Sequence, residues 1–397
     1  MQYDHITTDE QLEKLCSNLA NSTYIGFDTE FVSEDSYFPE LCLVQVAADD
    51  VLAVIDPQEI TDMSPFWNAL SNGDHLTIAH AAREEFRFCR LAVQRRPANL
   101  FDVQLAAGLV GIEYPASYGK LLNKLLGVRL AKGETRTDWR RRPLSDKQID
   151  YALQDVIYLK DIHSKIEAKL IKLGRLEWLQ EEMSVWQDEM EAAEKQERWR
   201  RVSGISGLPE KALVIVRELW RWREEIAQSK NRPPRRVLRD DLIVELARRG
   251  KSDVKQIRAI RGLDRSVAKH QIPMLSDAIA AALELPKTEW PKPYRPKPSP
   301  RATLLGQFIS TALSSICRSQ QLAPSIVGTV QDVRDLVTYH VFTDDESIDL
   351  EEIPALAKGW RAAVVGRSIE DLLEGKSVIR ISDPKAEEPL SIEPRDH

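Results

Sequence analysis

Hydrophobic residues near the start of the chain follow two different spacings. Leu12, Leu15 and Leu19 recur at helical spacing behind Thr8, a favourable N-cap, and this pattern predicts a helix over residues 8–21. Short apolar runs bounded by turn residues predict strands. These runs cover residues 24–31, 41–47, 51–55 and 76–80. Strands alternating with helices predict a mixed sheet flanked by helices, an α/β domain.

Farther along the chain, apolar residues recur at helical spacing only. A Ser/Gly stretch at residues 203–207 and a proline-rich stretch divide this part from its neighbours. At about 150 residues per domain, a chain of 397 residues predicts two or three domains. We expect an α/β domain at residues 1–200 and a helical bundle at residues 208–288. A stiff proline-rich linker at residues 289–300 should lead to a second helical domain at residues 301–382 and a disordered polar tail at residues 383–397.

The composition excludes several classes of protein. With 43% hydrophobic residues the chain can form a core, but no apolar run approaches the ~20 residues of a membrane span. The N-terminus lacks the basic and then apolar pattern of a signal peptide. The four cysteines show no C-x-x-C and no zinc-like spacing with histidine, as expected for free thiols. We therefore expect a cytoplasmic protein with no membrane contact.

Charge is distributed unevenly along the chain. Residues 198–297 hold 24 Lys and Arg against 12 Asp and Glu, a net charge of +12. Because the whole chain carries -7, the remainder carries -19. Such asymmetry is typical of a basic binding module attached to an acidic body, although a solvated helix face rich in arginine would look the same.

Two acids lie within the first apolar strand. Asp28 and Glu30 are two residues apart, so on a strand they point to the same face. Buried carboxylates need a partner that offsets their desolvation, and a divalent cation is the commonest partner of a convergent pair. The pair alone is equally consistent with a strand-end cap at Asp28 and a solvent-facing Glu30.

Two further stretches combine acids with other polar side chains. Glu85 follows His80 in the first turn of a predicted helix, where an acid also simply complements the helix dipole. Ser145 begins a capping box that predicts a helix from residue 146 to about 169. Tyr151 and Asp155 lie one turn apart on it, an arrangement that suits a water held beside a metal but is weak evidence alone.

These stretches resemble, in order and separation, the three motifs of the ribonuclease D family of DEDD exonucleases, in its tyrosine branch. The matching segments are residues 27–32 with 37–45, residues 79–85, and residues 138–145 with 151–159. The resemblance covers roughly the first 190 residues. It implies a ribonuclease H-like fold and a metal-dependent 3′→5′ exoribonuclease that releases 5′-nucleotides from RNA 3′ ends.

The helical part resembles a second family. Residues 219–223, 231–234 and 257–263 are similar to the HRDC domain, a nucleic-acid-binding bundle, and the basic surplus falls on it. Residues 301–382 resemble a second, degenerate HRDC-like domain. The resemblance implies that two small all-α HRDC-type bundles follow the α/β domain.

The family resemblance also implies the site residues. Two divalent ions, Mg²⁺ or Mn²⁺, would be held by Asp28, Glu30, Glu85 and Asp155. Tyr151 would orient the attacking water and accept its proton with the help of a metal. The residues expected to contact the nucleic acid are Thr29, Phe31, His80, Arg140, Arg141 and Arg142. The three arginines could equally lie in a solvent-exposed loop that contacts no phosphate.

One position departs from the family pattern. Where the family has aspartate, this chain has Glu85, so the carboxylate reaches about one methylene farther. Mg²⁺ is stricter in geometry than Mn²⁺, so we expect reduced or manganese-preferring activity. A catalytically impaired RNA-binding protein is the alternative. The expected partner is RNA with a free 3′ end, such as a tRNA precursor; DNA is not excluded. The sequence leaves protein partners open.

Overall fold

The computed structural model describes residues 2–130, 137–263, 271–293, 300–341, 353–386 and 388–395. These residues form two compact units. The first contains residues 1–30, 42–188 and 298–397, and the second contains residues 31–41 and 189–297. The predicted third domain therefore groups with the α/β domain, whereas the segment that follows Glu30 groups with the predicted HRDC-like bundle.

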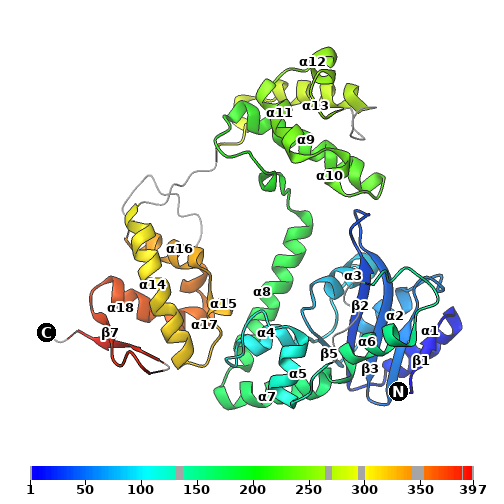
Figure 1. Ribbon diagram of the computed structural model, residues 1–397, viewed down its shortest axis with the longest axis vertical. Coiled ribbons are helices and arrows are strands. Elements are labelled where there is room, and N and C mark those ends of the chain that lie inside the picture. Colours follow the sequence, from blue (N-terminus) through cyan, green and yellow to red (C-terminus); the bar gives the residue numbers. More distant parts are fainter. Residues whose placement is uncertain are drawn as a thin grey trace. The chain divides into compact units, whose positions relative to one another are not determined.

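The first unit contains a six-stranded mixed sheet (Figure 1). The strand order is β1-β4-β3-β2-β5-β6. The pairs β1/β4, β2/β5 and β5/β6 are parallel, and β3/β4 is antiparallel. The strands are β1 (Asp4–Ile6), β2 (Tyr24–Val32), β3 (Glu40–Ala48), β4 (Val51–Ile55), β5 (Leu76–Ala79) and β6 (Leu100–Asp102). The predicted mixed sheet is confirmed; β1 and β6 are additions of three residues each, too short to show a periodicity.

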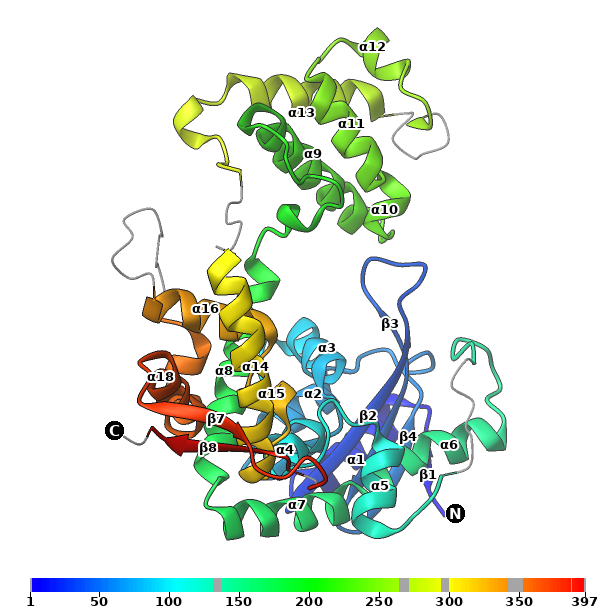
Figure 2. The same cartoon turned by 60° about the vertical axis from the view of Figure 1, so that its left-hand side comes forward.

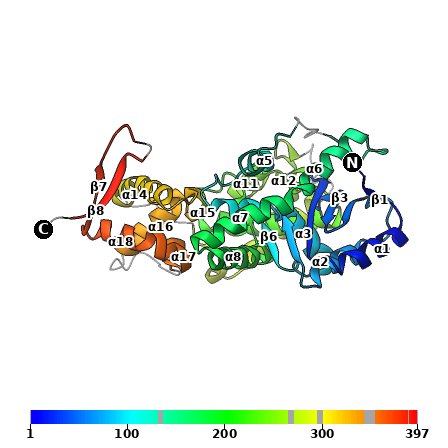
Figure 3. The ribbon, with the colours of Figure 1, turned by 90° about the horizontal axis from the view of Figure 1, so that it is seen from below.

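Helices cover both faces of this sheet. Helices α1 and α2 lie on one side of the strands and α6 on the other (Figure 3). The helices are α1 (Asp9–Leu19), α2 (Ser64–Ser71), α3 (Arg83–Val93), α4 (Val103–Gly108), α5 (Tyr118–Leu126), α6 (Asp146–Ile157), α7 (Leu159–Leu173) and α8 (Leu176–Lys195). The predicted helix over residues 146–169 is in fact two helices, because Tyr158 leaves helical geometry. None of the described helices is long and apolar enough to cross a membrane.

Aromatic packing holds one face of β2 in the core. Phe27 is fully buried, and its ring meets those of Phe66 and Trp67 edge-on at centroid distances of 6.3 and 6.4 Å. On the other side of the strand, Gly26 approaches Leu159, where an added Cβ would lie 3.3 Å from the leucine side chain. Both faces of β2 are thus packed as it approaches its two acids.

The second unit is a bundle of helices, as predicted. It contains α9 (Glu210–Ser229), α10 (Pro234–Val237), α11 (Asp240–Arg249), α12 (Val254–Arg258) and α13 (Ile272–Glu284). Segment 31–41 is bonded into it. The Tyr37 hydroxyl donates to Glu224 at 3.2 Å and accepts from Gln228 at 3.0 Å. The Asn231 side chain accepts from the backbone N–H groups of Tyr37 and Phe38.

The C-terminal region repeats the order of helices seen at the start of this bundle. Helices α14 (Pro300–Ser319), α15 (Pro324–Val327) and α16 (Val330–Val341) follow one another as α9, α10 and α11 do, and α10 and α15 are both four-residue helices that begin with proline. Helices α17 (Gly359–Arg361) and α18 (Arg367–Leu373), with a π-helical turn over residues 362–366, complete the helical part.

The predicted disordered tail is wrong for the described residues. Strand β7 (Ser377–Ile381) pairs antiparallel with β8 (Leu390–Pro394), beside α14 and α18 (Figure 2). A segment of only five residues gives little local signal, and the pairing with β7 supplies the hydrogen bonds that fix it. The C-terminal region is therefore not all-α.

Charged and aromatic contacts attach the C-terminal region to the α/β domain within the first unit. The Arg361 guanidinium donates to both carboxylate oxygens of Glu182, at 2.6 and 2.7 Å. The rings of Trp178 and Trp360 stack with centroids 5.3 Å apart. Buried Arg175 donates to the carbonyl oxygens of Leu109 and Gln321, at 2.7 and 2.9 Å.

The substitution Phe27→Ala tests the packing behind β2. Removing a fully buried phenylalanine is expected to lower the free energy of unfolding by about 3–5 kcal/mol, measured by urea denaturation. The matched control is Phe308→Ala on α14, where the side chain is 54% exposed and the expected change is within about 0.5 kcal/mol. Equal effects of the two substitutions would contradict the placement of Phe27 in the core.

Candidate active site

Three carboxylates from two elements meet beside β2. Asp28 and Glu30 lie on the same face of this strand, as the two-residue spacing predicts. Asp155 comes from α6 on that side of the sheet. One oxygen from each of the three residues lies within 4.8 Å of the others. In the described part of the chain no other group of three His, Cys, Asp or Glu side chains is this close together.

Helix α6 delivers Asp155 because its start is fixed. The Ser145 hydroxyl accepts from the Gln148 N–H at 3.3 Å, and the Gln148 side chain accepts from the Ser145 N–H at 2.9 Å, which confirms the predicted capping box. Tyr151 lies one turn before Asp155. Burial, and then the negative charges of Asp155, Glu30 and Asp28, raise the pKa of Tyr151 to about 12, so this phenol carries its proton at neutral pH.

Glu85 lies next to this cluster but outside it. Its side chain starts in the first turn of α3 and is buried, at 5% exposure. The Thr29 hydroxyl donates to the Glu85 carboxylate at 2.7 Å. The structure thus brings three of the four predicted metal ligands together and places the fourth beside Thr29, near enough that its charge raises the pKa of Asp28 and of Glu30.

The electrostatics of the cluster suit a cation. Burial is the largest cause that raises the pKa of Asp28 well above its ordinary value, followed by the charges of the neighbouring acids. Burial and the charges of Asp155 and Glu85 raise the pKa of Glu30 to about 8, and burial raises that of Asp155 to about 7. Hard oxygen ligands that repel one another in this way fit a divalent metal ion, which would offset both the repulsion and the desolvation.

Asp102 holds the corner at which α3 begins. Its carboxylate caps α4 by accepting from the Gln104 N–H at 2.8 Å, and it also accepts from the N–H groups of Ala81 and Ala82, both at 3.0 Å. Ala81 has a φ of 57°, a conformation that residues other than glycine rarely adopt. This corner fixes the turn that carries Glu85, and nothing in the sequence around Asp102 indicates it.

His80, expected to contact substrate, is engaged with the protein. Its Nε2 lies 2.9 Å from the carbonyl oxygen of Ala116, which also accepts from the Gln104 side chain at 2.9 Å. Since a carbonyl only accepts, Nε2 donates. Its ring also packs edge-on against that of Tyr118, with centroids 5.5 Å apart. These contacts give His80 a structural role and engage its Nε2, and a contact of His80 with substrate stays a prediction.

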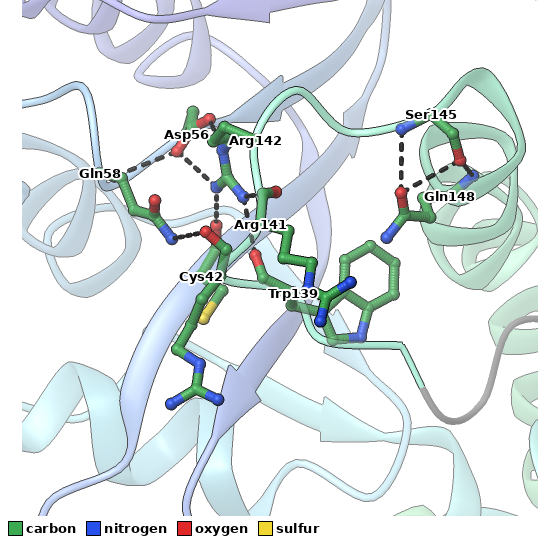
Figure 4. Close-up of polar contacts among 9 residues, drawn as sticks. Cys42, Asp56, Gln58, Trp139, Arg141, Arg142, Ser145 and Gln148 are labelled. Atoms are coloured by element: carbon green, nitrogen blue, oxygen red, sulfur yellow. Dashed lines mark hydrogen bonds and ion pairs between the residues drawn. The ribbon is translucent and has the colours of Figure 1, made fainter.

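The three consecutive arginines have different environments. Arg140 pairs with Asp138 at 2.8 Å, and Arg141 is exposed to 85%. Arg142 instead points inward, where its guanidinium bonds the Asp56 carboxylate and three backbone carbonyls (Figure 4). The expectation that Arg142 binds a phosphate is therefore wrong, because its donors are used inside the protein.

Thr29 and Phe31 follow the acids along β2. Thr29 is 5% exposed, and its hydroxyl is used by Glu85, so only its backbone remains for the expected contact with a nucleotide. Phe31 comes directly after Glu30 and is half-buried. Sequence reasoning missed Trp139, whose buried ring has its centroid 6.3 Å from that of Tyr151. In the sequence, the only indication of a role for Trp139 is its place within residues 138–145, which match the third family motif.

The chain matches two family models and many curated proteins. The first model, described as 3′-5′ exonuclease, matches residues 3–171, and the second, the HRDC domain, matches residues 212–279. Ribonuclease D of Sphingobium indicum is 33% identical over 384 residues, covering 95% of this chain and 96% of that protein. Ribonuclease D of Bartonella henselae is 30% identical over 387 residues, covering 96% and 92%.

A solved structure agrees over the same length. The crystal structure of Escherichia coli RNase D, an exoribonuclease involved in structured RNA processing, superimposes with a TM-score of 0.81 at 25% identity, covering 94% of this chain and 99% of that one. The sequence relatives and this fold agree over nearly the whole chain, and the two family models match residues 3–171 and 212–279 within it. The chain therefore belongs to the ribonuclease D family of 3′→5′ exoribonucleases.

Proposed function

We propose that Asp28, Glu30 and Asp155, with Glu85 as a fourth ligand, form the metal-dependent catalytic site of this exoribonuclease. The observation that carries the proposal is the meeting of three carboxylates, with oxygens within 4.8 Å of one another, beside a buried fourth. Divalent-metal dependence is a property of this exonuclease family.

The four acids suit two divalent ions, Mg²⁺ or Mn²⁺. Asp28, Glu30 and Asp155 would hold the first, and Glu85 would join Asp28 at the second after its carboxylate leaves the Thr29 hydroxyl. When bound, such ions supply Lewis-acid activation of water and neutralise charge on the phosphodiester and on the departing 3′ oxygen. Four carboxylates balance two dications, which leaves the site close to neutral before the RNA phosphate enters.

The chain's own residues position the reactants. Tyr151 keeps its proton at neutral pH, so its hydroxyl orients the attacking water as a hydrogen-bonding partner. Arg140 and Arg141 contact the RNA backbone, and Arg141 is the more exposed of the two. Phe31 and the backbone at Thr29 contact the terminal nucleotide. The product is a 5′-nucleotide released from the 3′ end.

The proposed substrate is a structured RNA such as a tRNA precursor. Escherichia coli RNase D acts in structured RNA processing, and the present chain aligns with 99% of that structure. Residues 198–297, which include the HRDC match, carry a net charge of +12. A basic module of this kind binds nucleic acid through phosphate contacts that weaken as salt rises.

An exonuclease assay tests the catalytic cluster. With 5′-labelled single-stranded RNA and Mg²⁺ or Mn²⁺, the chain is expected to shorten the strand stepwise and release nucleoside 5′-monophosphates. Asp155→Asn removes a ligand and is expected to slow the reaction by more than ~100-fold. The measurement is the rate of strand shortening on denaturing gels, with a DNA strand of the same sequence as a second substrate.

The matched control for this assay is Asp161→Asn, an exposed aspartate on α7. We expect this variant to keep the wild-type rate. An Asp155→Asn enzyme as fast as the control would contradict the proposed site. RNA that binds but stays intact with either metal would identify a non-catalytic RNA-binding protein, and preferred shortening of DNA would correct the substrate.

The substitution Glu85→Asp tests the effect of the longer side chain. Because the shorter acid restores the family's residue and cannot keep the same bond to Thr29, the Mg²⁺-supported rate should rise relative to the Mn²⁺-supported rate. We expect a change on the order of threefold in the ratio of kcat values, under ~1 kcal/mol. The control is Glu84→Asp on the neighbouring glutamate, which pairs with Arg87 at 3.4 Å. An unchanged ratio in Glu85→Asp would show that Glu85 does not select the metal.

The raised pKa of Glu30 predicts how the metal-free enzyme responds to pH. Its pKa rises from 4.5 to about 8 on folding, so the protonated form stabilises the fold below about pH 4.5 and this stability is lost as pH rises toward about 8. In EDTA, Glu30→Gln should therefore unfold at a higher temperature than wild type at about pH 8, and its unfolding temperature should vary less with pH.

The control for this experiment is Glu245→Gln, which breaks an exposed pair with Arg249 in the second unit. It should keep the wild-type pH profile. Adding Mg²⁺ should restore much of the stability that wild type loses at high pH, because the cation offsets the repulsion. Parallel profiles for wild type and Glu30→Gln would contradict the burial and repulsion ascribed to this carboxylate.

A further inference from the structure

The guanidinium of Arg142 is bonded through all three of its nitrogens. Nε and Nη2 donate to the Asp56 carboxylate, the second at 2.7 Å. Nη2 also donates to the carbonyl oxygen of Cys42 at 2.7 Å, and Nη1 donates to those of Trp139 and Arg141 at 2.7 and 3.0 Å. Figure 4 shows these bonds converging on a single side chain. The Asp56 side chain is only 3% exposed, so this is a largely desolvated ion pair.

These bonds fasten one loop to two strands. Asp56 comes directly after β4 and Cys42 lies in β3, whereas Trp139 and Arg142 lie in the loop that leads into α6. The Gln58 side chain adds a bond to the carbonyl oxygen of Arg140 at 3.3 Å. The Arg142 side chain therefore ties the loop before α6 to Asp56 and to the carbonyl of Cys42, while its bonds to the carbonyls of Trp139 and Arg141 hold the loop's own backbone. A bidentate arginine suits such a junction because its donors have fixed directions.

The fastened loop contains Trp139, which lies beside Tyr151 of the proposed catalytic site. Trp139 is 5% exposed, and its ring lies against that of Tyr151 at a centroid distance of 6.3 Å and an interplanar angle of 31°. Arg142 donates to the backbone carbonyl oxygen of Trp139 and so fixes the backbone from which this indole projects. The indole in turn limits the directions in which the Tyr151 ring can point.

We infer that the Asp56–Arg142 pair is a positioning device for Tyr151 that acts through Trp139. The inference rests on the role proposed above for Tyr151. A phenol that orients a water must hold one direction, and a displacement of about 1 Å at such a group costs up to ~100-fold in rate. Arg142 thus serves the reaction without touching the RNA, in contrast to the exposed Arg141.

The substitution Arg142→Lys separates this role from a phosphate contact. Lysine keeps the charge, but its single nitrogen cannot reach Asp56, Cys42 and Trp139 together. We expect kcat for RNA degradation to fall on the order of 10-fold or more while KM stays within about twofold. A kcat close to wild type, or a rise in KM alone, would overturn the inference, because either result is what a charge that binds phosphate gives.

A double-mutant cycle with Tyr151→Phe tests whether the effect passes through Tyr151. In the Tyr151→Phe background, Arg142→Lys should cost much less in kcat than in wild type, because the group it positions is already gone. If both substitutions lower kcat and their effects multiply, Tyr151 keeps its proposed role and the inference fails. If Tyr151→Phe alone leaves kcat unchanged, the proposed role of Tyr151 fails and the inference fails with it.

Two variants separate positioning from folding. Asp56→Asn keeps the shape of the acceptor but removes its charge, and it should lower kcat as Arg142→Lys does. The variant that carries both Asp56→Asn and Arg142→Lys should lose little more kcat than either single variant. Arg175→Lys is the matched control, since Arg175 is another buried arginine that donates to backbone carbonyls. It should lower the unfolding temperature without changing kcat per folded molecule. If Arg142→Lys behaves as this control does, the pair is merely structural and the inference is overturned.

Discussion

The mutual repulsion of closely spaced, half-buried carboxylates is the interaction on which the rest of this structure depends. Strand β2 places Asp28 and Glu30 on one face by its two-residue repeat, and α6 adds Asp155. Partly removing three neighbouring acids from water costs free energy unless a cation shares the site. Burial raises the pKa of all three acids, repulsion by neighbouring acids adds to it at Asp28 and Glu30, and the fold keeps the three together despite that cost. The divalent-metal site proposed for these residues would offset that cost.

Two other buried aspartates keep the elements around this cluster in place. Asp102 accepts from the N–H groups at the corner before α3 and so fixes the turn that carries Glu85. Asp56 binds Arg142 and so fastens the loop that leads into α6. In both cases a carboxylate near the end of a strand binds the segment that precedes a helix of the site. The side chains of the proposed site are thus held by polar contacts to the sheet in addition to packing.

The parts that sequence could predict are those whose signals are local. The caps at Thr8 and Ser145, the D-x-E spacing and the helical bundle all depend on residues within a few positions of one another, and the structure has each of them. Strands β1, β6, β7 and β8 were missed because a segment of three to five residues is defined by the strand it pairs with. The split at Tyr158 gave no local signal either.

The site was predicted less completely because its supporting contacts join distant positions. Arg140, Arg141 and Arg142 look alike in the sequence, and only the contact with Asp56, 86 positions away, assigns the third to the interior. Likewise the sequence predicts Glu85 as an acid of the site but not its bond to the Thr29 hydroxyl. Side chains of one type acquire different roles from partners that fold geometry alone brings close.

The most direct measurement is the anomalous scattering of crystals soaked in Mn²⁺. The account predicts strong manganese peaks in contact with the carboxylates of Asp28, Glu30 and Asp155, and a Glu85 side chain turned from Thr29 toward the metal. Crystals that bind manganese elsewhere, or that leave these carboxylates without a peak at saturating Mn²⁺, would contradict the claim that the buried acids exist to hold a divalent cation.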